Sequence, residues 1–316
     1  MFQAATNEHL IRSNLWSTQL KETLQDELMG IRYVDMITEF PDGDTLNIPS
    51  IGQMDTYDYE EGQAVRYTAM DTGNFTFTIT DYLASATYVT NKMLQDSYVM
   101  SRVQSSFVPK QNRAIMKTME IDVLAVGPAG QTTANSNTIN TAKHRFVGSG
   151  TNETITVEDF AKAKFALQKA NVPMTNLVAI VDPTVGYHLE THPNFVNMSN
   201  NPKWEGIVST GISTGTQFIK NIYGFDVYVS QNLKVNTASE AIDGVTAAAG
   251  VNNLFFSAAS DVLPFVGNVR QAPRVDSSYN KDFQREEYVT TCRYGFKLFR
   301  PENLVVVLTD TDQVYA

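Results

Sequence analysis

The sequence contains a single cysteine, Cys292, in 316 residues. One thiol excludes both an intramolecular disulfide framework and a zinc site built from several cysteines. Long apolar runs are also absent, because the longest, residues 304–308, is far shorter than the roughly 18 residues of a membrane-spanning helix. The first residues lack the basic stretch and apolar core of a secretory signal. We therefore expect no disulfide scaffold, membrane span or secretion signal.

Basic residues are scarce as well. The chain has 24 lysines and arginines against 34 acids, which gives a net charge of −10. Binding to nucleic-acid backbones depends on clustered Lys and Arg, so a dedicated DNA or RNA reader is disfavoured. A surface of the same sign as DNA would instead suit a container wall that must not stick to its contents. The apolar fraction of 42% argues against disorder, and the length predicts about two domains.

Two histidines suggest a zinc-site interpretation that the spacing does not support. His188 and His192 are four residues apart, but Glu190 follows the first His by two positions, whereas helical zinc proteases place a Glu directly after it. Pro193 predicts that the helix ends at this point, and a third ligand would also be needed. We therefore expect no metal and no cofactor. Weak calcium binding by the acidic segment 55–62 stays open where subunits meet.

Nucleophilic catalysis has little support. Residues 211–215 match G-x-S-x-G around Ser213, but a nucleophile elbow needs a His later in the chain, and all four histidines precede Ser213. Cys292 lies on the apolar face of a strand pattern, which favours a buried inert thiol. The sequence therefore predicts a protein that is not an enzyme, with a serine hydrolase at Ser213 as a weak alternative.

The most distinctive segment, residues 41–80, predicts a long β-hairpin. Strict alternation places Phe75, Phe77 and Ile79 on one face. The polar stretch 55–62, DTYDYEEG, forms a tip, and seven acids against one base make the hairpin acidic. Three stretches have strand character: 45–51, 65–70 and 74–80. Since two strands alone are marginal in water, the hairpin must pack on its own subunit or on a neighbour.

Two helices are predicted next. Apolar residues from Val89 to Phe107 recur at helical spacing, and Pro109 interrupts them in a position suited to the first turn of a second helix. On the wheel of 108–126 the apolar residues gather on one side: Val108, Ile115, Met119, Val123 and Val126. Three basic residues, Lys110, Arg113 and Lys117, gather opposite. This basic stripe is either an ordinary solvated face or a docking strip for an acidic partner, for which the hairpin is a candidate.

The remaining elements alternate helices and strands. Residues 7–31 carry a weak helical pattern ending near Gly30, typical of a surface helix or an arm. Thr156 with Asp159 three positions later predicts the capped start of a helix that ends near Ala170. Alternate residues from Tyr288 to Leu298 predict a strand with one apolar face. The other predicted elements are a loop at 127–154, strands at 176–183, 224–231, 251–260 and 304–308, a short helix at 183–191, and a turn at 300–303.

This order of elements resembles the major capsid protein fold shared by tailed bacteriophages, the herpesvirus shell and encapsulins. The C-terminal motifs Gln-Arg-Glu-Glu-Tyr (284–288) and Tyr-Gly-Phe-Lys-Leu-Phe (294–299) are similar to those of the family. The strand at 222–230 is also similar, although Asp226 replaces the usual Pro. The resemblance implies an α+β fold with four parts: an N-terminal arm (1–40), an E-loop (41–80), a peripheral domain (81–172 and 271–316) and an axial domain (173–270).

The resemblance also implies a function. The chain would assemble as a homo-oligomer into the hexamers and pentamers of an icosahedral virion shell around double-stranded DNA, in the host cytoplasm and then in the virion. Because the arm begins within a few residues of Met1, a separate scaffolding protein is expected. A portal protein is another expected partner and a decoration protein a further candidate, with no sequence-specific DNA binding and no membrane. The E-loop contains no lysine, so welding of subunits by an isopeptide bond from it is excluded.

In this interpretation the E-loop of one subunit lies across the peripheral domain of its neighbour. The predicted contact residues are Asp55, Tyr57, Asp58, Tyr59, Glu60, Glu61, Arg66, Lys110, Arg113 and Lys117. An encapsulin, with the same fold and protein cargo, is the nearest alternative. A tail-tube subunit is disfavoured by the predicted helices at 85–126 and 156–170.

Overall fold

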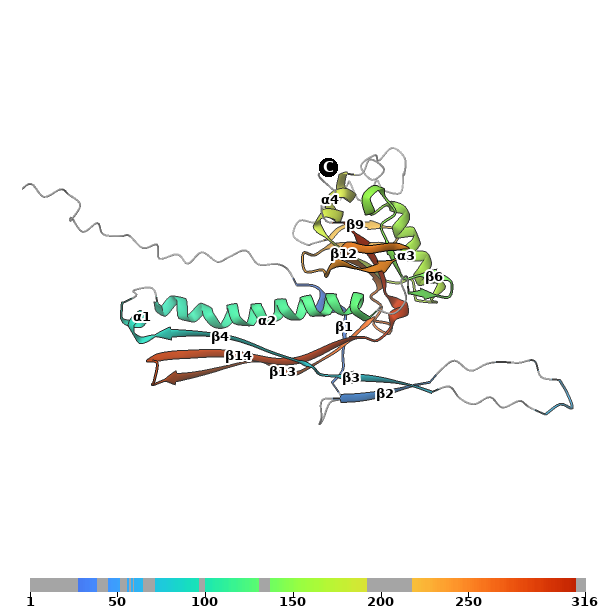
Figure 1. Ribbon diagram of the computed structural model, residues 1–316. Helices are drawn as coiled ribbons and strands as arrows, with labels where there is room; N and C mark the ends of the chain where they lie inside the picture. The colour runs from blue at the N-terminus through green and yellow to red at the C-terminus, as the bar shows by residue number, and fades with distance from the viewer. Residues whose placement is uncertain are drawn as a thin grey trace, which may run out of the picture.

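A computed structural model describes residues 28–38, 45–51, 56, 58, 60–64, 72–96, 100–130, 137–191 and 218–310. The chain combines two parts, a long flat sheet with a helix along it and a more compact body with a second sheet (Figure 1). Between β2 and β3, a hairpin projects from the end of the flat sheet, away from the helix. The α+β class predicted from the sequence is therefore confirmed.

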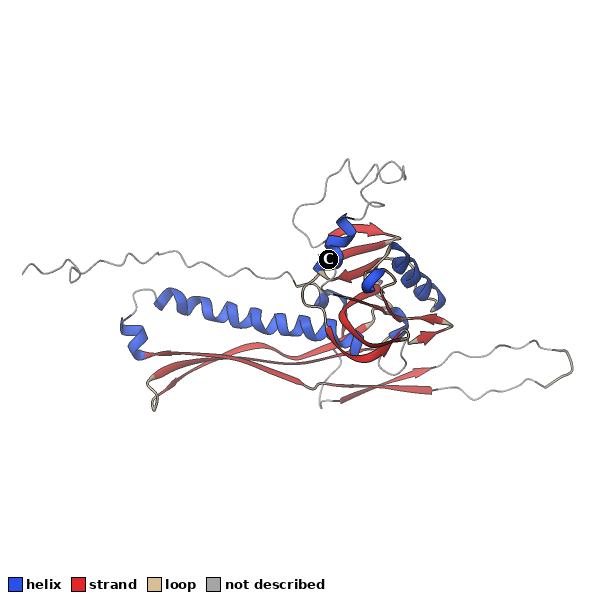
Figure 2. Cartoon of the chain, turned by 45° about the horizontal axis from the view of Figure 1, so that its top comes forward, coloured by secondary structure: helices blue, strands red, loops and turns tan. Residues whose placement is uncertain are grey.

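The flat sheet has four strands in the order β1-β13-β14-β4. These are β1 (Val34–Met36), β13 (Phe265–Asn280), β14 (Arg285–Leu298) and β4 (Asp81–Thr90). The helix α2 (Met100–Gly130) covers one face, after the short α1 (Asn91–Asp96) (Figure 2). Ile115 and Met119 of α2 are buried against Cys292 and Tyr294 of β14, which fixes the helix over that strand.

The second sheet has seven strands: β7 (Arg145–Val147), β15 (Val305–Thr309), β12 (Val245–Ser257), β8 (Leu177–Val181), β10 (Phe225–Val229) and β9 (Phe218–Ile222), with β11 (Val235–Ile242) paired to β12. Two helices belong to the same body, α3 (Val157–Lys169) and α4 (Pro183–Thr191). Phe160, Phe225 and Phe255 meet edge to face in its core, with ring centroids 5.1–6.4 Å apart. The short elements are η2 (Gly30–Tyr33), η3 (Thr151–Glu153), η6 (Pro301–Asn303), β5 (Thr138–Ile139) and β6 (Ala142–Lys143).

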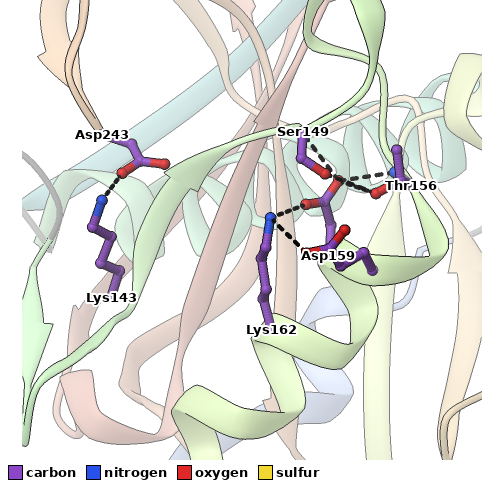
Figure 3. A network of polar contacts seen from close by, with 7 residues as sticks. Lys143, Ser149, Thr156, Asp159, Lys162 and Asp243 are labelled. Carbon is purple, nitrogen blue, oxygen red and sulfur yellow. Dashed lines mark hydrogen bonds and ion pairs between the residues drawn. The ribbon is translucent and has the colours of Figure 1, made fainter.

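The start of α3 confirms the predicted capping box. The buried carboxylate of Asp159 accepts hydrogen bonds from the backbone N–H groups of Thr156, at 2.8 Å, and Ser149, at 3.0 Å (Figure 3). Lys162 lies 3.5 Å from the other carboxylate oxygen. The helix ends before Asn171, whose φ of 57° is the left-handed conformation that stops a helix.

Most predicted strands are confirmed, but the segment after the hairpin differs. Val89 belongs to strand β4, not to a helix, because β4 pairs with β14 along its whole length. Pro109 does not start a new helix but lies inside the single 31-residue α2. Proline costs about 3 kcal/mol within a helix, and packing of the apolar face on β14 offsets that cost. The predicted arm helix 7–31 and the strand 65–70 fall mostly or wholly outside the described residues.

Cys292 is buried, as predicted, and its thiol donates to the carbonyl oxygen of Gln271. Burial raises the pKa of the thiol, which keeps it protonated and unreactive. Ser213 and His192 lie outside the described residues, whereas His188 lies in α4. In the part of the chain that the structure describes, no helix is long and apolar enough to cross a membrane.

The buried histidine His144 predicts acid lability. It is fully buried, and its Nε2 atom has no hydrogen-bond partner among the described residues. Burial lowers its pKa below the ordinary 6.5, although the carbonyl of Ala142 and the nearby Glu302 oppose this. The unfolded chain therefore binds the proton more readily, so the free energy of unfolding falls as the pH drops below about 6.5.

The substitution His144→Leu tests this effect. It is expected to remove the part of the pH dependence that comes from the imidazole, so that urea midpoints change less between about pH 7.5 and about pH 5 than in the wild-type chain. Equal pH dependence in the two proteins would contradict the assignment.

Candidate assembly surfaces

The legs of the projecting hairpin are anchored on their own subunit. Strands β2 (Thr45–Ile51) and β3 (Thr72–Thr78) pair antiparallel from Thr45↔Thr78 to Ile51↔Thr72. Phe77 is fully buried, and Phe75 packs edge to face on Phe299 with ring centroids 4.9 Å apart. This confirms the predicted apolar face. The base of the hairpin is therefore held by the body, while the strands lead away from it.

The tip carries acids without ion-pair partners. Asp58, Glu60 and Glu61 are exposed, and none of them forms an ion pair with another described residue. We call these three the acidic tip. A turn follows, in which the Gln63 N–H donates to the carbonyl of Glu60 and Gly62 has a φ of +90°. The predicted contact residues Asp55, Tyr57, Tyr59 and Arg66 lie outside the described residues.

The predicted basic stripe is found on one face of α2. Lys110 and Lys117 are exposed and Arg113 is half-buried, on the side away from the buried Ile115 and Met119. The structure therefore gathers the three basic residues as the helical wheel predicted. It does not bring them to the acidic tip of the same chain, because the hairpin projects away from α2. Any contact between the two charged groups must join different copies.

A buried carboxylate on α2 holds the chain segment that enters the flat sheet. Glu120 is fully buried. Its Oε1 and Oε2 atoms accept from the backbone N–H of Gly30 at 2.8 and 2.7 Å, and the N–H groups of Met29 and Ile31 donate at 3.0 and 3.4 Å. Gly30 fits because a Cβ there would lie 3.0 Å from the carboxylate. Glu120 thus fixes where residues 28–33 join the spine helix, a role that the sequence analysis missed.

The far end of the flat sheet is a rigid aromatic hairpin. The Arg285 guanidinium lies 4.6 Å from the ring centroid of Tyr88 and 4.7 Å from that of Phe283. Arg285 also pairs with Glu287 at 2.6 Å, and this hydrogen-bonded ion pair lowers the pKa of that carboxyl. Tyr88 and Phe283 nevertheless stay 57% and 66% exposed. Exposed aromatic rings stacked on an arginine are typical of contact surfaces.

The described residues contain no group of three or more His, Cys, Asp or Glu side chains placed to hold a metal. What the geometry offers is surface: a projecting acidic hairpin, a basic helix face and a long sheet. The sequence profile of a family described as phage capsid protein matches residues 74–307. The chain belongs to the phage capsid protein family. Membership in this family indicates a structural role in the shell of a virion.

Solved capsid structures share this fold. The capsid of cyanophage P-SCSP1u has a TM-score of 0.72 at 15% identity and covers 96% of this chain and 94% of its own. The capsid of cyanophage Pam1 gives 0.68 at 12% identity, with 99% and 100% covered. The capsid of Ralstonia phage GP4 gives 0.66 at 10% identity, with 99% of each chain covered. No curated protein matches the sequence. At these identities the structures support the fold, and the family match supports the role as a capsid protein.

Proposed function

We propose that this capsid protein assembles into hexamers and pentamers that form an icosahedral shell around double-stranded DNA. The observation that carries the proposal is the hairpin itself. Its apolar base is anchored on the body, whereas its acidic tip has no ion-pair partner among the described residues. A projecting element of this kind makes sense when a neighbouring copy receives it. Assembly would take place in the host cytoplasm, with a scaffolding protein, a portal protein and a candidate decoration protein as partners.

The four-part division also stays a proposal: arm 1–40, E-loop 41–80, peripheral domain 81–172 and 271–316, and axial domain 173–270. Sheet membership does not follow it throughout. Strands β7 and β15, which fall in the proposed peripheral segments, pair into the seven-stranded sheet, and β1 of the proposed arm pairs with β13. The chain thus crosses between the two sheets more often than the division implies.

The proposed contact places the acidic tip of one copy on the basic stripe of another. The predicted contact set from the sequence is retained: Asp55, Tyr57, Asp58, Tyr59, Glu60, Glu61 and Arg66 on the hairpin, and Lys110, Arg113 and Lys117 on α2. One exposed ion pair contributes only about 0–1 kcal/mol. Repetition of such contacts around a closed shell makes the total large, while each contact remains weak enough to break and re-form during assembly.

Negative-stain microscopy and size-exclusion chromatography of the purified chain, with its scaffolding protein when one is found, test the proposal. We expect closed particles of uniform size. Particles isolated from infected cells should contain DNA protected from nuclease, whereas an encapsulin would contain protein cargo. A chain that stays monomeric at every concentration and with every partner would contradict the proposal.

A further inference from the structure

The flat sheet has two open edges that differ in character. Beyond its short pairing with β1, the edge of β13 carries devices that discourage pairing with another strand. The β13–β14 register shifts between Val269 and Gln271 and again before Arg274, and Pro273 lies in this stretch. Charged side chains also line it: Arg270, Arg274 and Asp276. Bulges, proline and charges are the usual protection of an exposed edge.

The opposite edge, on β4, has none of these devices. The β4–β14 register runs without a shift from Asp81↔Tyr294 to Thr90↔Arg285. Residues 82–90 contain no charged residue, proline or glycine. No other strand in the described part of the chain pairs with β4. A regular, uncharged edge strand of ten residues is a strong template for pairing, so a free subunit would expose a surface that is expected to associate.

The backbone groups that face the open edge can be identified. The N–H of Asn91 donates to the carbonyl of Gln284 at 3.0 Å. In an antiparallel pair, hydrogen-bonded and non-hydrogen-bonded positions alternate. Odd-numbered residues of β4 therefore bond to β14, and the even-numbered ones point their N–H and C=O groups outward. These are Tyr82, Ala84, Ala86 and Tyr88, which are also the positions with exposed side chains.

The outward row is nearly symmetric about its centre. Along Tyr82-Leu-Ala-Ser-Ala-Thr-Tyr88, the outward residues read Tyr, Ala, Ala, Tyr on either side of Ser85. If a second β4 runs antiparallel about an axis at Ser85, Tyr82 meets Tyr88 of the other copy and Ala84 meets Ala86. Aromatic pairs across strands are favourable, and no like charges are brought together.

We propose that the open edge of β4 pairs antiparallel with β4 of a second copy, about a two-fold axis at Ser85. The inference rests on the proposed assembly into a shell and names one of its contacts. All outward residues bond to outward residues in this register. The two sheets would then be continuous, with the β14 strands of the two copies about 14 Å apart. Because α2 lies over β14 and packed helices need about 8–10 Å, the two spine helices fit side by side.

Cysteine cross-linking tests the register. Ser85 and its counterpart form a non-hydrogen-bonded pair, with Cα atoms about 4.5 Å apart, within the range that a disulfide spans. Particles of Ser85→Cys treated with oxidised glutathione are expected to give a dimer as the main band on a non-reducing gel. Thr87→Cys is the matched control, because the two copies of residue 87 would be about 13 Å apart. The native Cys292 is buried and should give no dimer in wild-type particles.

Hydrogen exchange of wild-type particles provides a measurement without substitutions. The amides of Tyr82, Ala84, Ala86 and Tyr88 should exchange slowly in the shell and quickly in dispersed chains, whereas those of Leu83 and Ser85 are protected in both. Intact particles whose Ser85→Cys chains do not cross-link would overturn self-pairing, even if these amides are protected, because another strand must then cover the edge. Such a result would leave the proposed function intact, which fails only if the wild-type chain forms no particles.

Discussion

Reversing the charge of the acidic tip with Glu60→Lys and Glu61→Lys is expected to abolish shell assembly without unfolding the chain. Both residues are exposed and have no ion-pair partner among the described residues, so the folded subunit loses nothing. In the shell, each hairpin would instead present two lysines to the basic stripe. Attractions of about 0–1 kcal/mol become repulsions of similar size at every copy, and a closed shell multiplies the change.

The measurement combines size-exclusion chromatography and negative-stain microscopy with circular dichroism of the unassembled chain. A double variant with the same change in net charge, Glu158→Lys with Asp261→Lys, is the control, because both acids are exposed and lie away from the tip. It is expected to assemble. Normal particles from the Glu60→Lys, Glu61→Lys chain would contradict the electrostatic contact.

A compensating pair identifies the partner surface. If the basic stripe receives the tip, adding Lys110→Glu and Lys117→Glu to the double lysine variant should restore particles, because the signs are exchanged rather than lost. If these four substitutions together still prevent assembly while each pair leaves the chain folded, the tip binds somewhere other than the stripe.

The sequence allowed the hairpin to be predicted but not the strand that follows it. Phe75 and Phe77 alternate with threonines, and this period of two is a direct sign of a half-buried strand. In β4 the exposed positions are Tyr and Ala rather than polar residues, so the alternation is blurred. Val89 then happens to stand four residues before Met93. Only the pairing with β14, about 200 residues away in sequence, decides in favour of a strand.

The same limit explains why the basic stripe was predicted and Glu120 was not. Lys110, Arg113 and Lys117 lie on one helix, so their relative positions follow from helical geometry alone. Glu120 acts on backbone groups 89–91 residues earlier in the chain. The one available sign was an acid next to the buried face, between Met119 and Val123. A wheel cannot distinguish such a residue from a solvated one, because the partner is backbone and carries no sequence signal.

Replacing Glu120 with alanine is expected to cost more stability than any other single change on α2. The N–H groups of Met29, Gly30 and Ile31 would lose their acceptor in a buried place, and each buried donor left unpaired costs about 1–3 kcal/mol. We expect the free energy of unfolding to fall by roughly 3 kcal/mol or more, measured by urea denaturation of the dispersed chain. Glu120→Gln should lose less, because its carbonyl oxygen still accepts from Gly30.

Ile121→Ala is the matched control for Glu120→Ala. It removes a 39% exposed side chain from the adjacent position and should cost less than about 1 kcal/mol. If Glu120→Ala is no more destabilising than this control, the carboxylate does not hold the segment at Gly30. If it is, hydrogen exchange should show the amides of residues 29–31 released first. The spine helix then sets the path by which the chain from the N-terminus reaches the flat sheet, because the contact that breaks is the one between Glu120 and that segment.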